Sequence, residues 1–281
     1  MERISLFEII QEPKVGALGE THIALTKKDA CKHFVLDWTK HASKQLSLVV
    51  ESSVIVDILE IGSSSERNLD ITLHDHSQVQ WRAVNLVEGK DAHVFFRLDS
   101  SASLDYAFAD FAKGTETIDM NVDLIGPSAS LTCHMAAMSY ESDQKSISVS
   151  VHHQAPDTYA LVSSYGVAQG TGLLKFSGTS HIFHGAPKSK THQNAKIMVF
   201  DPHSVGRANP ILKIDENDVE ASHSAAVGKV NDEHLFYLCS RGLTPHEAKR
   251  LITMGYLNPI IRYFNEKHVQ KAIEKAIMGR I

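Results

Sequence analysis

Residues 46–151 consist of short segments rich in β-branched and aromatic residues that follow one another with almost no helical periodicity. Several segments alternate apolar and polar residues, which is the period of a strand with one face turned inward. The connections between them, such as 62–65 and 126–128, are short turns that leave no room for the crossover helices of an α/β fold. The pattern therefore predicts an all-β body. Its candidate strands are 46–51, 54–61, 69–74, 79–86, 93–98, 103–108, 117–124, 130–135 and 146–151.

Strand patterns alone leave the architecture of this body open. A sandwich, a closed barrel and a β-solenoid, in which each coil stacks on the previous one, all fit the observed segments. No strict short repeat such as a hexapeptide is visible, so periodicity does not single out the solenoid.

The chain divides into three parts by its pattern. Residues 1–45 show no clear period and are expected to form an irregular lead-in, residues 46–228 form the β body, and residues 229–281 are helical. The last convincing strands are 196–200 and 210–214. This places the stretch that follows them at a join between strands and helices.

Helix boundaries are well marked after this join. Asn231 is placed to cap a helix that runs through Ser240, and Gly242 is placed to end it. Residues 244–247, Thr-Pro-His-Glu, have the form of a capping box with proline at the first helical position. This second helix is expected to run to Met254.

A third helix is expected to begin at Asn258-Pro259. Its apolar stripe consists of Ile260, Ile261, Phe264, Val269, Ile273 and Ile277. Because the period changes near Gly228 without a linker, the helices are expected to fold against the end of the β body. The residues of the first two helices expected to face inward are Leu235, Phe236, Leu238, Leu251 and Ile252.

Composition and charge exclude several classes of protein. The 281 residues carry 28 basic and 33 acidic side chains, and a formal charge of -5 gives no nucleic-acid footprint. The three cysteines, Cys31, Cys133 and Cys239, are far apart, which favours a reducing compartment over a disulfide framework. No run approaches the roughly 18–20 apolar residues of a membrane span, and the first residues lack the order of a signal peptide. A cytoplasmic protein without membrane contact is expected.

The stretch 222–228, Ser-His-x-Ala-x-Val-Gly, is followed by a short acidic segment, Leu-Phe-Tyr-Leu at 235–238 and Ser-Arg-Gly at 240–242. This order resembles the closing signature of the SufB/SufD family, the scaffold proteins of iron–sulfur cluster assembly, over residues 210–257. Further segments that are similar in the same order are 151–158, 178–186 and 191–193. The resemblance implies a right-handed parallel β-helix followed by a C-terminal α-helical segment.

The resemblance also implies a functional position. His223 matches a histidine that SufD proteins require where SufD meets SufB and the nascent cluster forms, and Ser222 matches the preceding serine. Ala221 stands where that motif has a cysteine. The SufB scaffold cysteine would fall on Ser204, and the SufB glutamate on Ser224, so the chain is closer to SufD. Clusters are held by thiolates, so no stably bound cofactor is expected and a cluster is expected only transiently in a complex.

Partners follow from the same resemblance. It implies pairing with a SufB-type subunit or a second copy through the β-helix, and docking of SufC, an ABC-type ATPase, on the C-terminal helices. The residues expected on the helix surface that contacts this ATPase are Glu233, Arg241, His246 and Arg250. The chain has no phosphate-binding glycine-rich loop and no nucleophilic triad spacing, so a non-catalytic assembly protein is expected.

Two other interpretations remain. The sequence has 17 histidines, and the pairs at 74 and 76, 152 and 153, and 181 and 184 have spacings that suit a histidine-metal enzyme. No Cys-x-x-Cys or His-Glu-x-x-His pattern supports them, so no metal site is predicted. A β-helical hydrolase would need paired carboxylates in a cleft, which the sequence does not show. The replacements at Ala221, Ser204 and Ser224 also fit a degenerate SufD paralogue that has lost its role.

Overall fold

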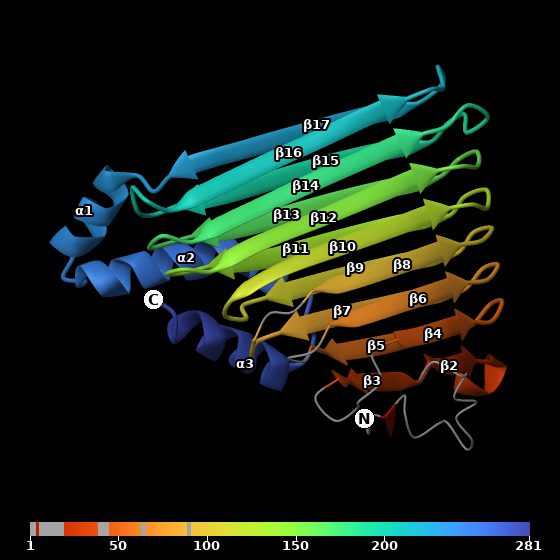
Figure 1. Cartoon of the computed structure of the whole chain (residues 1–281), viewed down its shortest axis with the longest axis horizontal. Helices are drawn as coiled ribbons and strands as arrows, with labels where there is room; N and C mark the ends of the chain where they lie inside the picture. The colour runs from red at the N-terminus through yellow and green to blue at the C-terminus, as the bar shows by residue number, and fades with distance from the viewer. Residues whose placement is uncertain (1–3, 6–19, 39–44, 63–65, 89–90) are drawn as a thin grey trace.

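The structure is a computed structural model that describes residues 4–5, 20–38, 45–62, 66–88 and 91–281 (Figure 1). Its strands are β1 (Ile4–Ser5), β2 (Glu20–Leu25), β3 (His33–Asp37), β4 (Gln45–Val50), β5 (Ile55–Ile61), β6 (Arg67–Leu73), β7 (Gln78–Asn85), β8 (Ala92–Leu98), β9 (Ser103–Asp110), β10 (Thr115–Leu124), β11 (Ser130–Ser139), β12 (Gln144–His153), β13 (Tyr159–Ala168), β14 (Leu173–Ile182), β15 (Lys190–Val199), β16 (Val205–Ile214) and β17 (Glu220–Lys229). The helices are α1 (Asp232–Ser240), α2 (Pro245–Ile261) and α3 (Lys267–Met278), with a short 3₁₀ turn, η2, at Lys27–Asp29.

The strands form two sheets that the chain visits alternately. Odd-numbered strands make a nine-stranded sheet and even-numbered strands an eight-stranded sheet, each in sequence order. Neighbouring strands are parallel and paired in register, as in Ile118↔Ile147 of β10 and β12. The protein is therefore a parallel β-solenoid with helices at its C-terminal end, which confirms the predicted mainly β body and the solenoid that the resemblance implied (Figure 1). Parallel pairing rules out the antiparallel sandwich.

The coils turn at corners with a repeated backbone conformation. A non-glycine residue with φ between 56° and 62° occupies one corner of successive coils, at Cys31, Ser53, His76, Ser101, Ser128, Asp157 and Lys188. Each of these residues donates its backbone N–H to the next coil, as Ser101 does to Pro127 O over 2.9 Å. The left-handed conformation is unfavourable for most side chains, so the stacked hydrogen bonds are what holds it.

Apolar side chains fill the space between the two sheets. Alternation sends every second residue inward, so β12 alternates exposed or half-buried residues with buried ones along its whole length. Aromatic rings occupy the middle of the solenoid: Trp81 and Phe96 meet edge to face with centroids 5.6 Å apart, and Phe96 meets Tyr106 at 5.8 Å. Trp81 also donates its indole N–H to buried Glu60 over 2.8 Å.

The helix boundaries are partly as expected. Asn231 caps α1 by accepting the N–H of Glu233 over 2.7 Å, and Gly242 lies beyond the helix with φ +99°. The capping box of Thr244 and Glu247 is confirmed. The predicted end of the second helix at Met254 and the predicted start of a third at Asn258 are wrong, because α2 continues through Gly255 and Pro259 to Ile261.

The buried face of α2 explains this continuation. Pro259 lies in the last turn, where it removes one backbone hydrogen bond without interrupting the rest of the helix. Leu257, Ile260 and Ile261 on either side of it are buried, so continued packing offsets the loss. The stripe predicted for the third helix is buried as expected, although it is divided between the end of α2, the following loop and α3.

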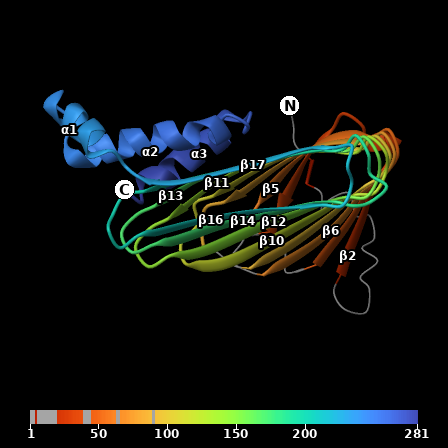
Figure 2. The same ribbon diagram turned by 90° about the horizontal axis from the view of Figure 1, so that it is seen from above.

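The expectation that the helices pack against the end of the body is wrong, because α2 and α3 lie on the outer face of the nine-stranded sheet (Figure 2). There Phe264 and Ile273 pack with Ala107, Ala136 and other small residues of β9 and β11, which allow close approach. Hydrogen bonds from polar side chains also stabilise the contact between the helices and the sheet. Arg82 of β7 donates to Tyr263 O over 2.8 Å, and Arg280 donates to Ala112 O over 2.5 Å.

Candidate functional site

At the C-terminal end of the solenoid, each sheet ends in a strand that has one unpaired edge. Strand β16 is the last of the eight-stranded sheet and β17 the last of the nine-stranded sheet, so in the described structure each pairs on one side only (Figure 1). The sequence placed the last strands at 196–200 and 210–214, whereas β17 is a further ten-residue strand paired in register with β15. Its alanine, serine and glycine residues have low strand propensity, and the pairing overrides it.

This end of the solenoid exposes both backbone and apolar side chains. Ile214 and Val227 are each more than a third exposed, although their register partners Ile182 and Ile197 are buried, because no further described coil covers them. Ile211, on the outer face of β16, is 47% exposed. Long exposed edges are templates for pairing with another chain. Pro210 lies within β16, and proline in a sheet is normally confined to an edge strand.

The strand alternation sends Ser222 and His223 to opposite faces. Ser222 faces outward, where its Oγ lies 2.7 Å from His192 Nδ1. His223 is the register partner of the inward-facing Gln193, so it lies on the side of β17 that faces the open mouth of the solenoid. His223 is exposed and makes no hydrogen bond to any residue that the structure describes. The two predicted residues are therefore neighbours in sequence that do not form one site.

The positions that replace the family's ligands have ordinary polar roles. Ser204 is buried at a turn and donates its hydroxyl to Asp201 O over 2.8 Å. Ser224 donates to Asn194 Oδ1 over 3.0 Å, and Ala221 pairs with Thr191 in the sheet. None of these groups supplies a thiolate at the open end.

The cysteines lie on three separate elements. Cys31 is exposed at a corner, Cys133 is buried inside the solenoid, and Cys239 is half-buried in α1. Burial raises the pKa of the Cys133 thiol, and the charge of Asp105 adds to this effect, so this thiol stays protonated. Within the described ranges no group of three His, Cys, Asp or Glu side chains could hold a metal ion.

The three histidine pairs do not converge as metal sites. His74 and His181 each face a carboxylate, at 2.6 Å from Asp99 and 2.7 Å from Asp215. His184 is almost fully exposed. His152 and His153 point to opposite sides of β12, where they face Asp123 and Thr158 respectively.

The helix surface differs from the prediction at three residues. Glu233, Arg241 and His246 are exposed as expected, but Arg250 is half-buried. Phe236 and Leu251 were expected to face inward, yet they are 76% and 54% exposed.

The exposure of Phe236 follows from the position of α1, which has no buried residue (Figure 1). The sequence carried a signal for this arrangement. Residues 235–239, Leu-Phe-Tyr-Leu-Cys, surround the helix with apolar side chains, and so short a helix cannot bury them all on one face. The exposed large apolar side chains of α1 and α2, which we call the helix patch, are Phe236, Tyr237 and Leu251.

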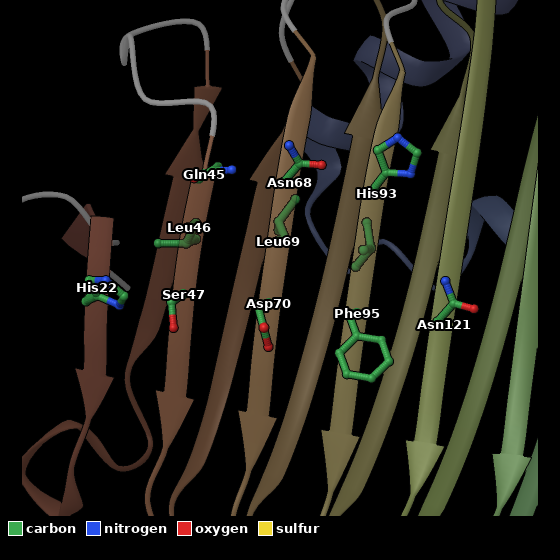
Figure 3. Close-up of a pocket in the computed structure, with 11 residues that line it drawn as sticks. His22, Gln45, Leu46, Ser47, Asn68, Leu69, Asp70, His93, Phe95 and Asn121 are labelled. Carbon is green, nitrogen blue, oxygen red and sulfur yellow. The ribbon is translucent and has the colours of Figure 1, made fainter. Parts of the chain in front are cut away.

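A shallow groove of about 410 Å³ lies at the other end of the solenoid, on the outer face of the eight-stranded sheet (Figure 3). Its polar side chains include Asn68 and Asp70 of β6 and Asn121 of β10. Arg97 binds Asp70 at 2.5 Å and covers the Phe95 ring at 4.2 Å from its centroid. No sequence pattern indicated this groove.

These features define a class of protein: a parallel β-solenoid with an open, strand-edged end and a helical segment fixed on one flank. The family model for the SUF system FeS cluster assembly SufBD core domain matches residues 29–256, and the chain belongs to this family. It is SufD-like, and the match confirms the resemblance inferred from residues 210–257.

Curated relatives agree with this membership. The iron–sulfur cluster assembly protein SufD of Bacillus subtilis is 26% identical over 216 residues, covering 75% of this chain and 49% of the relative. A SufBD family protein of Mycobacterium bovis is 32% identical over 126 residues, covering 45% of this chain and 15% of the relative. A SufBD family protein of Staphylococcus epidermidis is 25% identical over 142 residues, covering 50% of this chain and 30% of the relative. The chain thus spans about half of Bacillus SufD and less of the others. None of the described helices is long and apolar enough to cross a membrane.

Proposed function

We propose that this chain is a SufD-like, non-catalytic subunit of an iron–sulfur cluster assembly complex. It pairs through the open end of its solenoid with a SufB-type subunit or a second copy, and it docks a SufC-type ABC ATPase on its C-terminal helices. Family membership and similarity to a SufD protein support this proposal. The observation that carries it is the pair of ten-residue strands whose outer edges are unpaired in the described structure.

The open end has the properties of a protein interface. Two adjacent strand edges offer backbone hydrogen bonds, and the apolar side chains of Ile211 and Val227 offer area to bury. His223 lies at the mouth with its imidazole unengaged by described residues, so a cluster forming at the interface would have a nitrogen ligand from this chain.

The cluster is cargo of the complex rather than a resident cofactor of this subunit. Clusters are normally held by thiolates, and the three cysteines of this chain lie on separate elements, one of them buried. Ligands from this chain alone therefore do not suit stable cluster binding. The thiolates must come from the partner.

The helix patch is the proposed docking surface for the ATPase. Exposed aromatic side chains are typical anchors of interfaces, and Arg241 lies with its guanidinium 5.2 Å from the centroid of Tyr237. Glu233 and His246 are exposed on the same helices and supply a polar rim. Arg250 contributes less than expected from sequence, because it is half-buried.

Co-purification tests both contacts. The tagged chain is co-expressed with the SufB-type and SufC-type proteins of its own genome, and the retained subunits are quantified. The amount of ATPase retained by the double variant Phe236→Asp and Leu251→Asp should fall at least tenfold, since the variant removes two exposed anchors. The amount of retained SufB-type subunit should stay the same. Charge reversal at Arg241 should weaken the ATPase more moderately, because rim charges act mainly on association rate.

The matched control is Met278→Asp, which places the same charge on a partly exposed apolar residue of α3 outside the helix patch. It should retain both partners. A wild-type chain that retains neither partner contradicts the proposal. A double variant that binds the ATPase unchanged contradicts the docking surface alone.

A further inference from the structure

Three ionisable side chains meet inside the closed part of the solenoid. Lys145 is the second residue of β12, Asp110 the last of β9 and Glu116 the second of β10, and all three are completely or almost completely buried. Lys145 Nζ lies 2.9 Å from Asp110 Oδ1 and 2.9 Å from Glu116 Oε1. An amine, a carboxyl carbon and a second carboxyl group are thus held within reach of each other and away from water.

The neighbours orient the two carboxyl groups. Asn85 donates its side-chain N–H to Glu116 Oε2 over 3.0 Å, and the backbone N–H of Ala112 donates to Asp110 Oδ1 over 3.2 Å. Asp110 Oδ2 and Glu116 Oε1 receive no hydrogen bond from the described residues, and the approaches of Lys145 Nζ lack hydrogen-bond angles. Buried polar atoms without partners are rare and call for a chemical explanation.

One proton shared by the carboxyl groups supplies part of this explanation. Burial and the nearby charge of Asp110 together raise the pKa of Glu116 to about 9, against the opposing effect of Lys145. Glu116 is therefore a neutral acid at pH 7. A protonated Glu116 hydrogen-bonds Asp110, as a buried carboxylic acid does when it polarises a neighbouring carbonyl.

We propose that Lys145 and Asp110 condense to an intramolecular amide, an isopeptide bond, with Glu116 as the proton-transfer group. The proposal goes beyond the function in cluster assembly and does not depend on it. It rests on the burial of the three groups, on the two short approaches of Nζ and on the unpartnered oxygens.

The reaction balances without any further reagent. In the dry site a proton passes from the Lys145 ammonium to the Asp110 carboxylate, which leaves a neutral amine and a carboxylic acid. The Nζ lone pair then attacks the Asp110 carboxyl carbon and forms the C–N bond, while Glu116 donates its proton to the carboxyl oxygen. The C–O bond breaks and the oxygen leaves as water, and Glu116 recovers a proton from the nitrogen. One ammonium and one carboxylate become one amide and one water, and no oxidant is needed.

The fixed positions of the amine and the carboxyl group favour their condensation. Amines and carboxylates do not condense readily in water, but fixed, aligned groups in an enclosed site gain a large effective concentration. The bond joins a strand of the nine-stranded sheet to a strand of the eight-stranded sheet, so it clamps successive coils together. A covalent link of this kind restricts the unfolded chain in the same way as a disulfide does.

Mass spectrometry of the intact, denatured full-length protein tests the proposal. The wild type should be lighter than its calculated mass by one water molecule, and a protease digest should contain one branched peptide joining the segments of Lys145 and Asp110. A wild type of full calculated mass, with both segments recovered as separate linear peptides, overturns the proposal.

Variants identify the chemistry. Lys145→Arg keeps the charge but should show the full calculated mass, and Glu116→Gln should leave most molecules unlinked. Asp110→Asn should lose one ammonia in place of water. The matched control is Glu60→Gln, because the buried Glu60–Arg67 pair, at 3.1 Å, is the same kind of ion pair without an amine. It should remain lighter by one water, and a deficit that persists in Lys145→Arg also overturns the assignment.

Discussion

The closed coils and the terminal coil are built from the same kind of strand but differ in what surrounds them. Strand β10 pairs on both sides, and its inward residues are buried. Among the described strands, β17 pairs with β15 alone, and nine of the ten residues of β17 are exposed. Backbone pairing is thus sufficient to form a strand of full length, whereas burial requires a coil on each side. Stability is therefore concentrated in the closed coils.

The largest expected effect is in the closed coils. Phe96→Ala removes a fully buried ring that packs against Trp81 and Tyr106, and it should lower the free energy of unfolding by about 3–5 kcal/mol. Urea denaturation followed by circular dichroism measures this loss. A loss below about 1 kcal/mol would show that the closed coils are no better packed than the end.

A second effect in the closed coils depends on pH. Burial lowers the pKa of His153 to about 4, from about 6.5 in an unfolded chain. Between these two pKa values the imidazole is protonated in the unfolded state and neutral in the folded state. The free energy of unfolding therefore falls as the pH falls from 6.5 to 4. The full loss is on the order of 3 kcal/mol.

The variant His153→Asn should flatten this part of the stability curve, as measured by thermal unfolding at a series of pH values. Thr158→Val removes the 2.8 Å contact to His153 Nδ1 but keeps the buried imidazole. This control should retain the acid-dependent loss, because burial is the main cause of the low pKa. An unchanged slope in His153→Asn would assign the acid sensitivity to other groups.

The smallest effect on stability is expected at the open end. Val227→Lys replaces a side chain that is 47% exposed, so the free energy of unfolding of the isolated chain should change by less than about 0.5 kcal/mol. The same charge should weaken pairing at the open end, because a lysine on an edge strand opposes further pairing. Light scattering after size exclusion, with and without the SufB-type subunit, distinguishes the two effects. A large loss of stability with unchanged pairing would reverse the comparison.

Sequence patterns predicted the middle of the molecule better than its end. Alternation located all nine candidate strands between 46 and 151, because buried apolar and exposed polar residues follow the pleat there. Strand β17 was missed because its alanines and serines carry no alternation once nothing covers them. In α2, local signals at Gly255 and Pro259 suggested a break that tertiary packing overrides.

The candidate site was only partly readable from sequence. The histidine at 223 came from a family resemblance, and the alternation that separates it from Ser222 required the knowledge that this stretch is a strand. Phe236 and Leu251 of the helix patch were assigned to the wrong face, although the apolar residues 235–239 surround α1 and cannot all be buried on one face. The buried side chains of Lys145, Asp110 and Glu116 come from three strands, and only the register of the coils brings them together.

The stacked corners set the unit in which this protein can change its length. Each left-handed corner residue, such as Ser101 or Ser128, donates to the corner of the next coil, although the residue types differ from coil to coil. An insertion of one or two residues at a corner would put every later strand out of step with its neighbours. Gain or loss of a complete coil would keep the ladder intact and leave the same two strands at the open end. Length variation in such a molecule is therefore expected to come in whole coils.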